Sequence, residues 1–216
     1  MKERIQKAIR KNKLIAIVRG AEAEACICVA QALYDGGFRL MEITYDQKHP
    51  ESWENTARAI GAVAKAFEGK MYVGAGTVTC TELVDLTHQY DCHFIISPDV
   101  NEEVIRRTCA LGMVSIPGAL TPTEIMRAHH AGADFVKLFP AGNLGLDYIK
   151  AIMAPISHVN LLVVGGIKEN DVQAYLDAGI TGFGIGSNIV SKALLESKAY
   201  DQITELARKY VKVIEK

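Results

Sequence analysis

Short runs of apolar residues recur along the chain at nearly even intervals, and the segments between them repeat apolar residues every three or four positions. Such runs are typical of buried strands, and the longer spacing is typical of helices with one buried face. The expected strands are LIAIV from 14, LMEIT from 40, MYVGA from 71, HFIIS from 93, VSIPG from 114, FVKLF from 135, LLVVG from 161 and FGIGS from 183. Strand then helix, eight times, predicts a (β/α)8 TIM barrel, one domain over residues 1–216 with an extra N-terminal helix.

Helix start and stop signals agree with this register. Thr121-Pro122-Thr123-Glu124 predicts a capping box with proline in the first turn, and Thr79 to Glu82 is a second candidate. Glycines follow four of the helical patterns, where helices are expected to end, at positions 36, 112, 132 and 179.

A doubly wound sheet is the competing architecture, with GAGTVT at 74–79 as its phosphate loop. Thr79 replaces the third glycine of that motif, and no clear acidic residue closes a following strand. The barrel is therefore the preferred prediction.

Composition narrows the class of protein. The 216 residues are 49% hydrophobic, carry a net charge of −1, and contain no run of five like charges, so neither nucleic acid nor a membrane is an expected partner. The N-terminus matches neither a secretion signal nor a membrane span. Five scattered cysteines fit reduced thiols in a cytoplasmic protein, and their spacing does not suggest a zinc site.

In a TIM barrel the active site is built at the C-terminal ends of the strands, so polar residues there are informative. The candidates are Arg19, Glu42, Thr44, Thr77, Ser97, Lys137 and the glycines near 165 and 186.

Lys137 is the most unusual of these because it lies inside the apolar strand FVKLF. Burial lowers the pKa of a lysine, and the neutral amine is a nucleophile toward carbonyl carbon. The alternative is a structural ion pair, with Glu42 as the expected partner. Glu42 itself, in LMEIT, is a candidate for moving protons near neutral pH, or for orienting Lys137 only.

Two glycine-bearing turns, VVGGIK at 163–168 and GIGSNI at 184–189, follow the seventh and eighth expected strands. Backbone N–H groups at such turns bind phosphate without a cationic side chain, and TIM barrels often place a phosphate there. The alternative is that these glycines only form tight turns.

Several motifs together resemble the aldolases of 2-keto-3-deoxy-6-phosphogluconate (KDPG) and 4-hydroxy-2-oxoglutarate (KHG). In order they are MEIT, GAGTVT, IISPD, SIPGALTPTE, DFVKLFPA, VVGGI and GIGSNIV, and they span about residues 14 to 190. The resemblance implies a metal-independent class I aldolase without a cofactor, and a homotrimer.

The resemblance also implies roles for individual residues. Lys137 would form a Schiff base with pyruvate, and Glu42 would shuttle protons through a water. Thr77 would help hold the pyruvyl part of the substrate, and Pro98 would be a further substrate-binding residue. The phosphate would lie on the two glycine turns, at Gly165, Gly166, Gly186 and Ser187.

The chain departs from the gluconate-type pattern at two positions. Asp46 stands where those enzymes usually carry an arginine for the substrate carboxylate, so Arg19 is the expected substitute. Val164 stands where they often have threonine, and galactonate-type relatives resemble this chain more closely at both places.

The expected function is cleavage of 2-keto-3-deoxy-6-phosphogluconate to pyruvate and glyceraldehyde 3-phosphate, with 4-hydroxy-2-oxoglutarate as a further small-molecule substrate. The galactonate epimer is the first alternative. A phosphosugar isomerase or epimerase would use Glu42 as a base and form no imine, and a phosphosugar-binding barrel would show no turnover.

Overall fold

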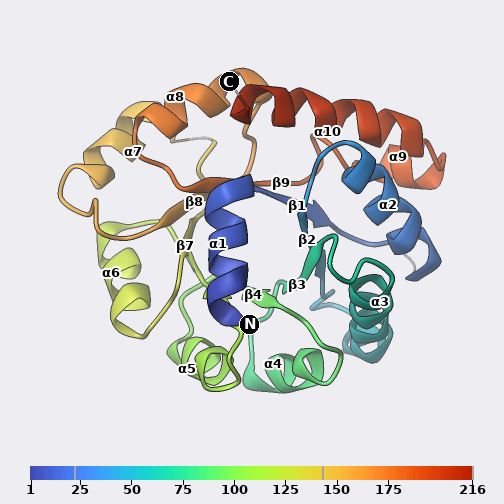
Figure 1. Ribbon diagram of the computed structural model, residues 1–216. Coiled ribbons are helices and arrows are strands. Elements are labelled where there is room, and N and C mark those ends of the chain that lie inside the picture. Colours follow the sequence, from blue (N-terminus) through green and yellow to red (C-terminus); the bar gives the residue numbers. More distant parts are fainter. Residues whose placement is uncertain (22, 143, 216) are drawn as a thin grey trace.

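The computed structural model describes residues 1–21, 23–142 and 144–215, and over them strands alternate with helices around a central barrel (Figure 1). The strands are β1 (Leu14–Val18), β2 (Leu40–Thr44), β3 (Tyr72–Gly76), β4 (Phe94–Ile96), β5 (Val114–Ile116), β6 (Gly118–Ala119), β7 (Val136–Leu138), β8 (Leu161–Val164) and β9 (Gly182–Ile185). Every strand pair is parallel, the first strand β1 pairs with the last strand β9, and the two ends of the strand order, β5 and β6, are consecutive in the chain. This order is that of a barrel, so the predicted barrel is confirmed and the doubly wound alternative is wrong.

The fifth expected strand is divided into two short strands, which form the two ends of the sheet. The strand order begins with β5 and ends with β6, and only Pro117 separates the two along the chain. Proline has no N–H for a strand ladder. Its carbonyl accepts from the Lys137 N–H at 2.8 Å, so β5 pairs with β4 and β6 pairs with β7.

The helices surround the sheet on its outer side, except the first, which lies across one end of the barrel. They are α1 (Lys2–Asn12), α2 (Ala23–Asp35), α3 (Trp53–Ala66), α4 (Thr81–His88), α5 (Glu102–Ala110), α6 (Pro122–His130), α7 (Gly145–Met153), α8 (Val172–Asp177), α9 (Lys192–Glu196) and α10 (Tyr200–Ile214), with short 3-10 turns η1 (Pro50–Ser52) and η2 (Glu169–Asp171). None of the helices among the described residues is long and apolar enough to cross a membrane.

Helix boundaries follow the sequence signals in most places. The capping box at Thr121 and Glu124 forms at the start of α6, with Pro122 in its first turn. The second expected box does not form, because α4 begins one residue later than that box requires, with Cys80 at the N-cap and no side-chain cap. Gly112, Gly132 and Gly179 follow α5, α6 and α8 with positive φ, whereas after α2 the positive φ falls on Gly37.

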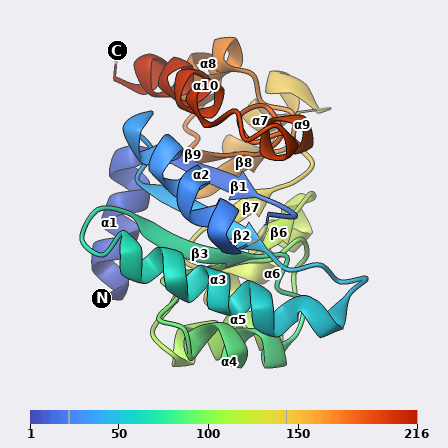
Figure 2. The same cartoon turned by 90° about the vertical axis from the view of Figure 1, so that its right-hand side faces the viewer.

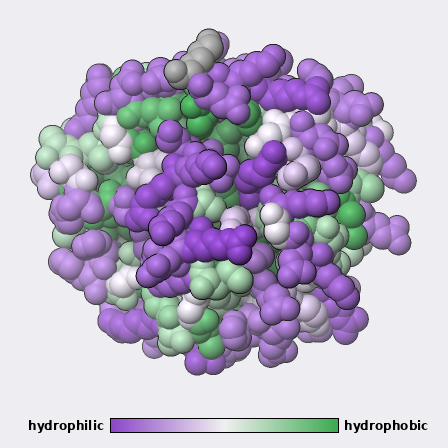
Figure 3. Space-filling model, viewed as in Figure 1, coloured by the Kyte–Doolittle hydropathy of each residue, from purple (hydrophilic) through white to green (hydrophobic). Residues whose placement is uncertain are grey.

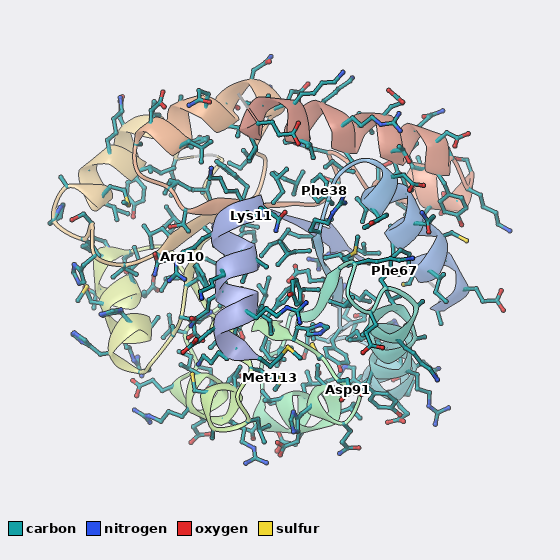
Figure 4. The ribbon with its side chains drawn as sticks, in the orientation of Figure 1. Arg10, Lys11, Phe38, Phe67, Asp91 and Met113 are labelled. Atoms are coloured by element: carbon teal, nitrogen blue, oxygen red, sulfur yellow. The ribbon has the colours of Figure 1, made fainter. Side chains whose placement is uncertain are left out.

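The extra N-terminal helix closes one end of the barrel. Ile5 and Ile9 of α1 are buried and pack with apolar residues from the barrel interior. Arg10, labelled in Figure 4, lies at this end with its guanidinium carbon 5.1 Å from the centre of the Phe135 ring. The centre of the surface over α1 is hydrophilic in Figure 3. The C-terminal strand ends lie at the opposite end of the barrel, as Figure 2 shows.

Candidate active site

Side chains of β2 alternate between the helices and the barrel interior. Leu40 packs in the interior cluster, and residues two positions apart on a strand face the same side, so Glu42 and Thr44 also point inward. All three side chains are buried. The second strand therefore delivers a carboxylate and a hydroxyl toward the C-terminal end of the barrel.

Lys137 lies across the interior on β7 and is 8% exposed. It lines one narrow pocket together with Glu42, and the other lining residues are apolar or glycine: Ile15, Ile17, Ile96, Ile116, Leu162, Val164 and Gly184. No ion pair or hydrogen bond joins Lys137 to Glu42 among the described contacts, so the ion pair considered as the alternative role of Lys137 is not formed.

The apolar pocket changes the protonation of both groups. Burial raises the pKa of Glu42 to about 7, although the nearby charges of Lys137 and Arg19 oppose the shift. Burial also lowers the pKa of Lys137, against the opposing charge of Glu42 and with the repulsion of Arg19. An amine more easily deprotonated than usual and a carboxyl titrating near neutral pH are suited to nucleophilic attack and proton transfer.

Glycine at position 76 makes room for the Glu42 carboxylate. A Cβ atom there would lie 2.7 Å from Glu42 Cδ, 2.8 Å from Glu42 Oε2 and 2.8 Å from Thr44 Cγ2. Because these atoms border this one position, the Glu42 carboxylate and the Thr44 side chain lie close together. Glu42 Oε2 and Thr44 Oγ1 are both buried without a hydrogen-bond partner among the described residues. Buried polar atoms usually have a hydrogen-bond partner. These two oxygens therefore indicate that a ligand group binds between them when the protein functions.

Thr77 follows Gly76 in the strained left-handed region, with φ of 59°. A β-branched residue is uncommon there, and such strain is often found at functional sites. The Thr77 carbonyl accepts a hydrogen bond from Gln47 Nε2 at 2.8 Å, and Gln47 Oε1 accepts from Thr79 Oγ1 at 2.9 Å. These two hydrogen bonds with Gln47 hold the loop that contains Thr77.

Arg19 directly follows β1 and is exposed at the same end of the barrel. Its charge acts on both Glu42 and Lys137, so the predicted arginine lies near these two groups, but it does not line the pocket itself. Asp46 does not line the pocket, and its carboxylate accepts from the Lys48 backbone N–H at 2.9 Å.

Pro98 and Ser97 follow β4, where the chain passes close to β6. A Cβ atom at Gly118 would lie 2.4 Å from the Pro98 carbonyl oxygen, so glycine allows this approach. Ser97 is buried, and its backbone N–H donates to the Ile116 carbonyl at 3.2 Å.

The two glycine turns follow β8 and β9 as expected. Gly165 and Gly166 have φ of 98° and 73°, a region that favours glycine. After β9, the N–H groups of Ile189 and Val190 donate to the Gly186 carbonyl, each at 2.9 Å, and close a turn with Ser187 exposed on it.

Phe139 is a site residue that the sequence pattern did not single out. Its ring centre lies 4.6 Å from Lys137 Nζ, a Cβ atom at Gly165 would lie 3.4 Å from the ring, and the side chain is 37% exposed. The available signal was its spacing, because Phe139 stands two residues after Lys137 and so faces the same side.

The fold and the site define a TIM barrel with a buried lysine, which forms no ion pair with any described residue, and a buried glutamate at the C-terminal ends of its strands. The family model for KDPG and KHG aldolase matches residues 5–206. This chain belongs to that family and is an enzyme of the carbon–carbon lyase class.

Two relatives illustrate the range of the family. The chain is 33% identical to the 2-dehydro-3-deoxy-6-phosphogalactonate aldolase of Escherichia coli K12, over 95% of this chain and 98% of the relative. It is 28% identical to the 2-dehydro-3-deoxy-phosphogluconate aldolase of Haemophilus influenzae, over 98% and 97%. The names of these two relatives differ in the sugar acid.

A solved structure with the same fold is the KDPG aldolase of Legionella pneumophila with pyruvate captured at low pH as a covalent carbinolamine intermediate. Its TM-score is 0.83 at 25% identity, and the match covers 94% of this chain and 96% of that one.

Proposed function

We propose that this enzyme is a class I aldolase that cleaves a 2-keto-3-deoxy-6-phospho sugar acid to pyruvate and glyceraldehyde 3-phosphate through a Schiff base on Lys137. The observation that carries the proposal is the buried Lys137 amine, which shares an apolar pocket with Glu42 but makes no ion pair with it. The same site would cleave 4-hydroxy-2-oxoglutarate to pyruvate and glyoxylate.

The neutral Lys137 amine attacks the C2 carbonyl carbon and forms a carbinolamine, from which Glu42 assists the loss of water. The protonated imine then withdraws electrons, the C3–C4 bond breaks, and the C4 hydroxyl proton passes to Glu42. The electron pair of that bond is held as an enamine. Protonation at C3 restores the imine, and hydrolysis releases pyruvate and the free amine.

The remaining residues hold the substrate in this proposal. The exposed guanidinium of Arg19 pairs with the substrate carboxylate, while Thr77 and Pro98 contact the pyruvyl part. Gly165, Gly166, Gly186 and Ser187 bind the phosphate, which is supported by the left-handed glycine backbone and the exposed serine. Binding energy from the distant phosphate orients the reacting carbons.

The galactonate epimer is the preferred substrate in this proposal, whereas the motifs alone put the gluconate epimer first. Val164 lines the pocket and offers no hydroxyl to a substituent at C4. Gly184 leaves room for its side chain, because a Cβ atom at that position would lie 2.8 Å from Val164 Cγ2. The relative from Escherichia coli, named for the galactonate substrate, supports the same choice.

Pyruvate release from the two epimers tests this function. The wild type should cleave both, with kcat/KM about tenfold higher for the galactonate epimer. Lys137→Arg, which keeps the charge but cannot form the imine, should cleave neither. No pyruvate from either epimer would overturn the proposed activity, and a gluconate preference would overturn the choice of epimer only.

We extend the proposal to the assembly and the compartment. The family resemblance implies that residues 1–216 act as one aldolase domain in a cytoplasmic homotrimer. A mass of three chains by light scattering would support the trimer, and a monomer would contradict it.

A further inference from the structure

The carbonyl oxygen of Ile167 receives two hydrogen bonds at the end of the first glycine turn. Asn188 Nδ2 donates to it at 2.7 Å, and the Tyr210 hydroxyl donates to it at 2.9 Å. Asn188 Nδ2 also donates to the Tyr210 oxygen at 3.2 Å, so the three groups form a closed triangle.

The triangle joins three separate parts of the chain. Ile167 directly follows Gly165 and Gly166, Asn188 lies in the turn that follows β9, and Tyr210 belongs to α10. It therefore links the two glycine turns to each other and anchors both to the C-terminal helix.

The backbone of the first turn needs such a link. Both of its glycines have left-handed φ angles, and glycine reaches many other conformations at little cost. Ile167 and Tyr210 are each 2% exposed, and two donors on one buried carbonyl fix the direction of that peptide group. Burial raises the pKa of Tyr210, so its hydroxyl remains a donor throughout the neutral range.

We propose that Asn188 and Tyr210 are positioning residues that hold the two glycine turns in the relative placement needed to bind the substrate phosphate. They thereby determine the preference of the enzyme for phosphorylated over unphosphorylated keto acids. The inference rests on the proposed function, which assigns phosphate to these turns, and the Tyr210 hydroxyl acts through Ile167 rather than on the substrate.

The test compares a phosphorylated with an unphosphorylated substrate in Tyr210→Phe and Asn188→Ala. Each variant should raise KM for the 6-phospho sugar acid about tenfold, while kcat/KM for 4-hydroxy-2-oxoglutarate stays within about twofold of the wild type. The double variant should lose less than the product of the two single effects, because both side chains act on one carbonyl.

Tyr175→Phe is the matched control. Tyr175 lies on α8 with a buried side chain, and its hydroxyl makes no hydrogen bond to another described residue. This variant should leave KM for both substrates unchanged, so an equal rise in KM there would count against the inference.

Equal changes on both substrates, or no change on either, would overturn the positioning role while leaving the aldolase function intact. Circular dichroism and a melting curve on each variant separate a local effect from unfolding, since partial unfolding would reduce both activities alike. A wild type that releases no pyruvate from any keto acid would instead overturn the proposed function, and the positioning role with it.

Discussion

Lys137 and Glu42 face one apolar pocket from β7 and β2, and no ion pair joins them. Two opposite charges left apart in a low-dielectric interior would be costly unless their pKa values shift. The pKa of Glu42 rises to about 7 and that of Lys137 falls, which allows neutral forms of both groups near physiological pH. This arrangement suits a reaction that moves protons, and four of the predictions below concern it.

Glu42→Gln removes the titrating group while keeping the shape of the side chain. We expect kcat to fall at least about a hundredfold, because general acid–base catalysis contributes that much. In the wild type, kcat/KM against pH should show a limb with an apparent pKa near 7, and the variant should lose it. A limb near 7 that persists in Glu42→Gln would assign the titration to another group.

The same substitution should change how stability depends on pH. The Glu42 carboxyl has a pKa of 4.5 in the unfolded chain and about 7 in the folded protein. Between these pH values the folded state therefore holds a proton that the unfolded state has lost. The contribution of this group to the free energy of unfolding is fully present below pH 4.5. It falls by up to ~3 kcal/mol as the pH rises to about 7. Urea unfolding from pH 4.5 to 8 should show a steeper decline for the wild type than for Glu42→Gln. Parallel curves would contradict the raised pKa.

Thr44→Val should separate stability from activity. The Thr44 hydroxyl is buried and has no hydrogen-bond partner in the part of the chain that the structure describes, so an isosteric methyl group should stabilise the fold by ~1 kcal/mol. Because Thr44 packs beside the Glu42 carboxylate, kcat should fall about tenfold.

Thr108→Val is the control for that variant. Its buried hydroxyl donates to the Val104 carbonyl on α5, away from the pocket, so this change should neither stabilise the protein nor lower kcat. Unchanged kcat in Thr44→Val would show that the Thr44 hydroxyl only fills space.

The sequence predicted the barrel because each strand is a short apolar run, and it predicted Lys137 and Glu42 because charged residues inside such runs are rare. It did not predict that Pro117 divides the fifth strand. VSIPG has the pattern of one continuous strand, and the division is visible only once the neighbouring strands on both sides are known. Asn188 and Tyr210 were also missed. A polar residue in a turn and a tyrosine on an amphipathic helix carry no local signal, and only the tertiary fold brings them to the Ile167 carbonyl.

Val164→Thr tests the basis of epimer preference. The new hydroxyl would enter the pocket wall at the position expected to face C4 of the substrate. The ratio of kcat/KM for the galactonate epimer to that for the gluconate epimer should fall about tenfold. Val163→Thr is the control, because Val163 lies on the same strand with its side chain toward the helices. A similar change in ratio for both variants would remove Val164 as the determinant.

Reductive trapping shows whether Lys137 forms a covalent imine with pyruvate. The protein is incubated with pyruvate and sodium borohydride, its intact mass is measured, and the modified peptide is mapped, with Lys137→Arg treated in parallel. We predict one reduced pyruvyl adduct on Lys137 and none in the variant. An unmodified wild type, with a known class I aldolase labelled under the same conditions, would contradict the account.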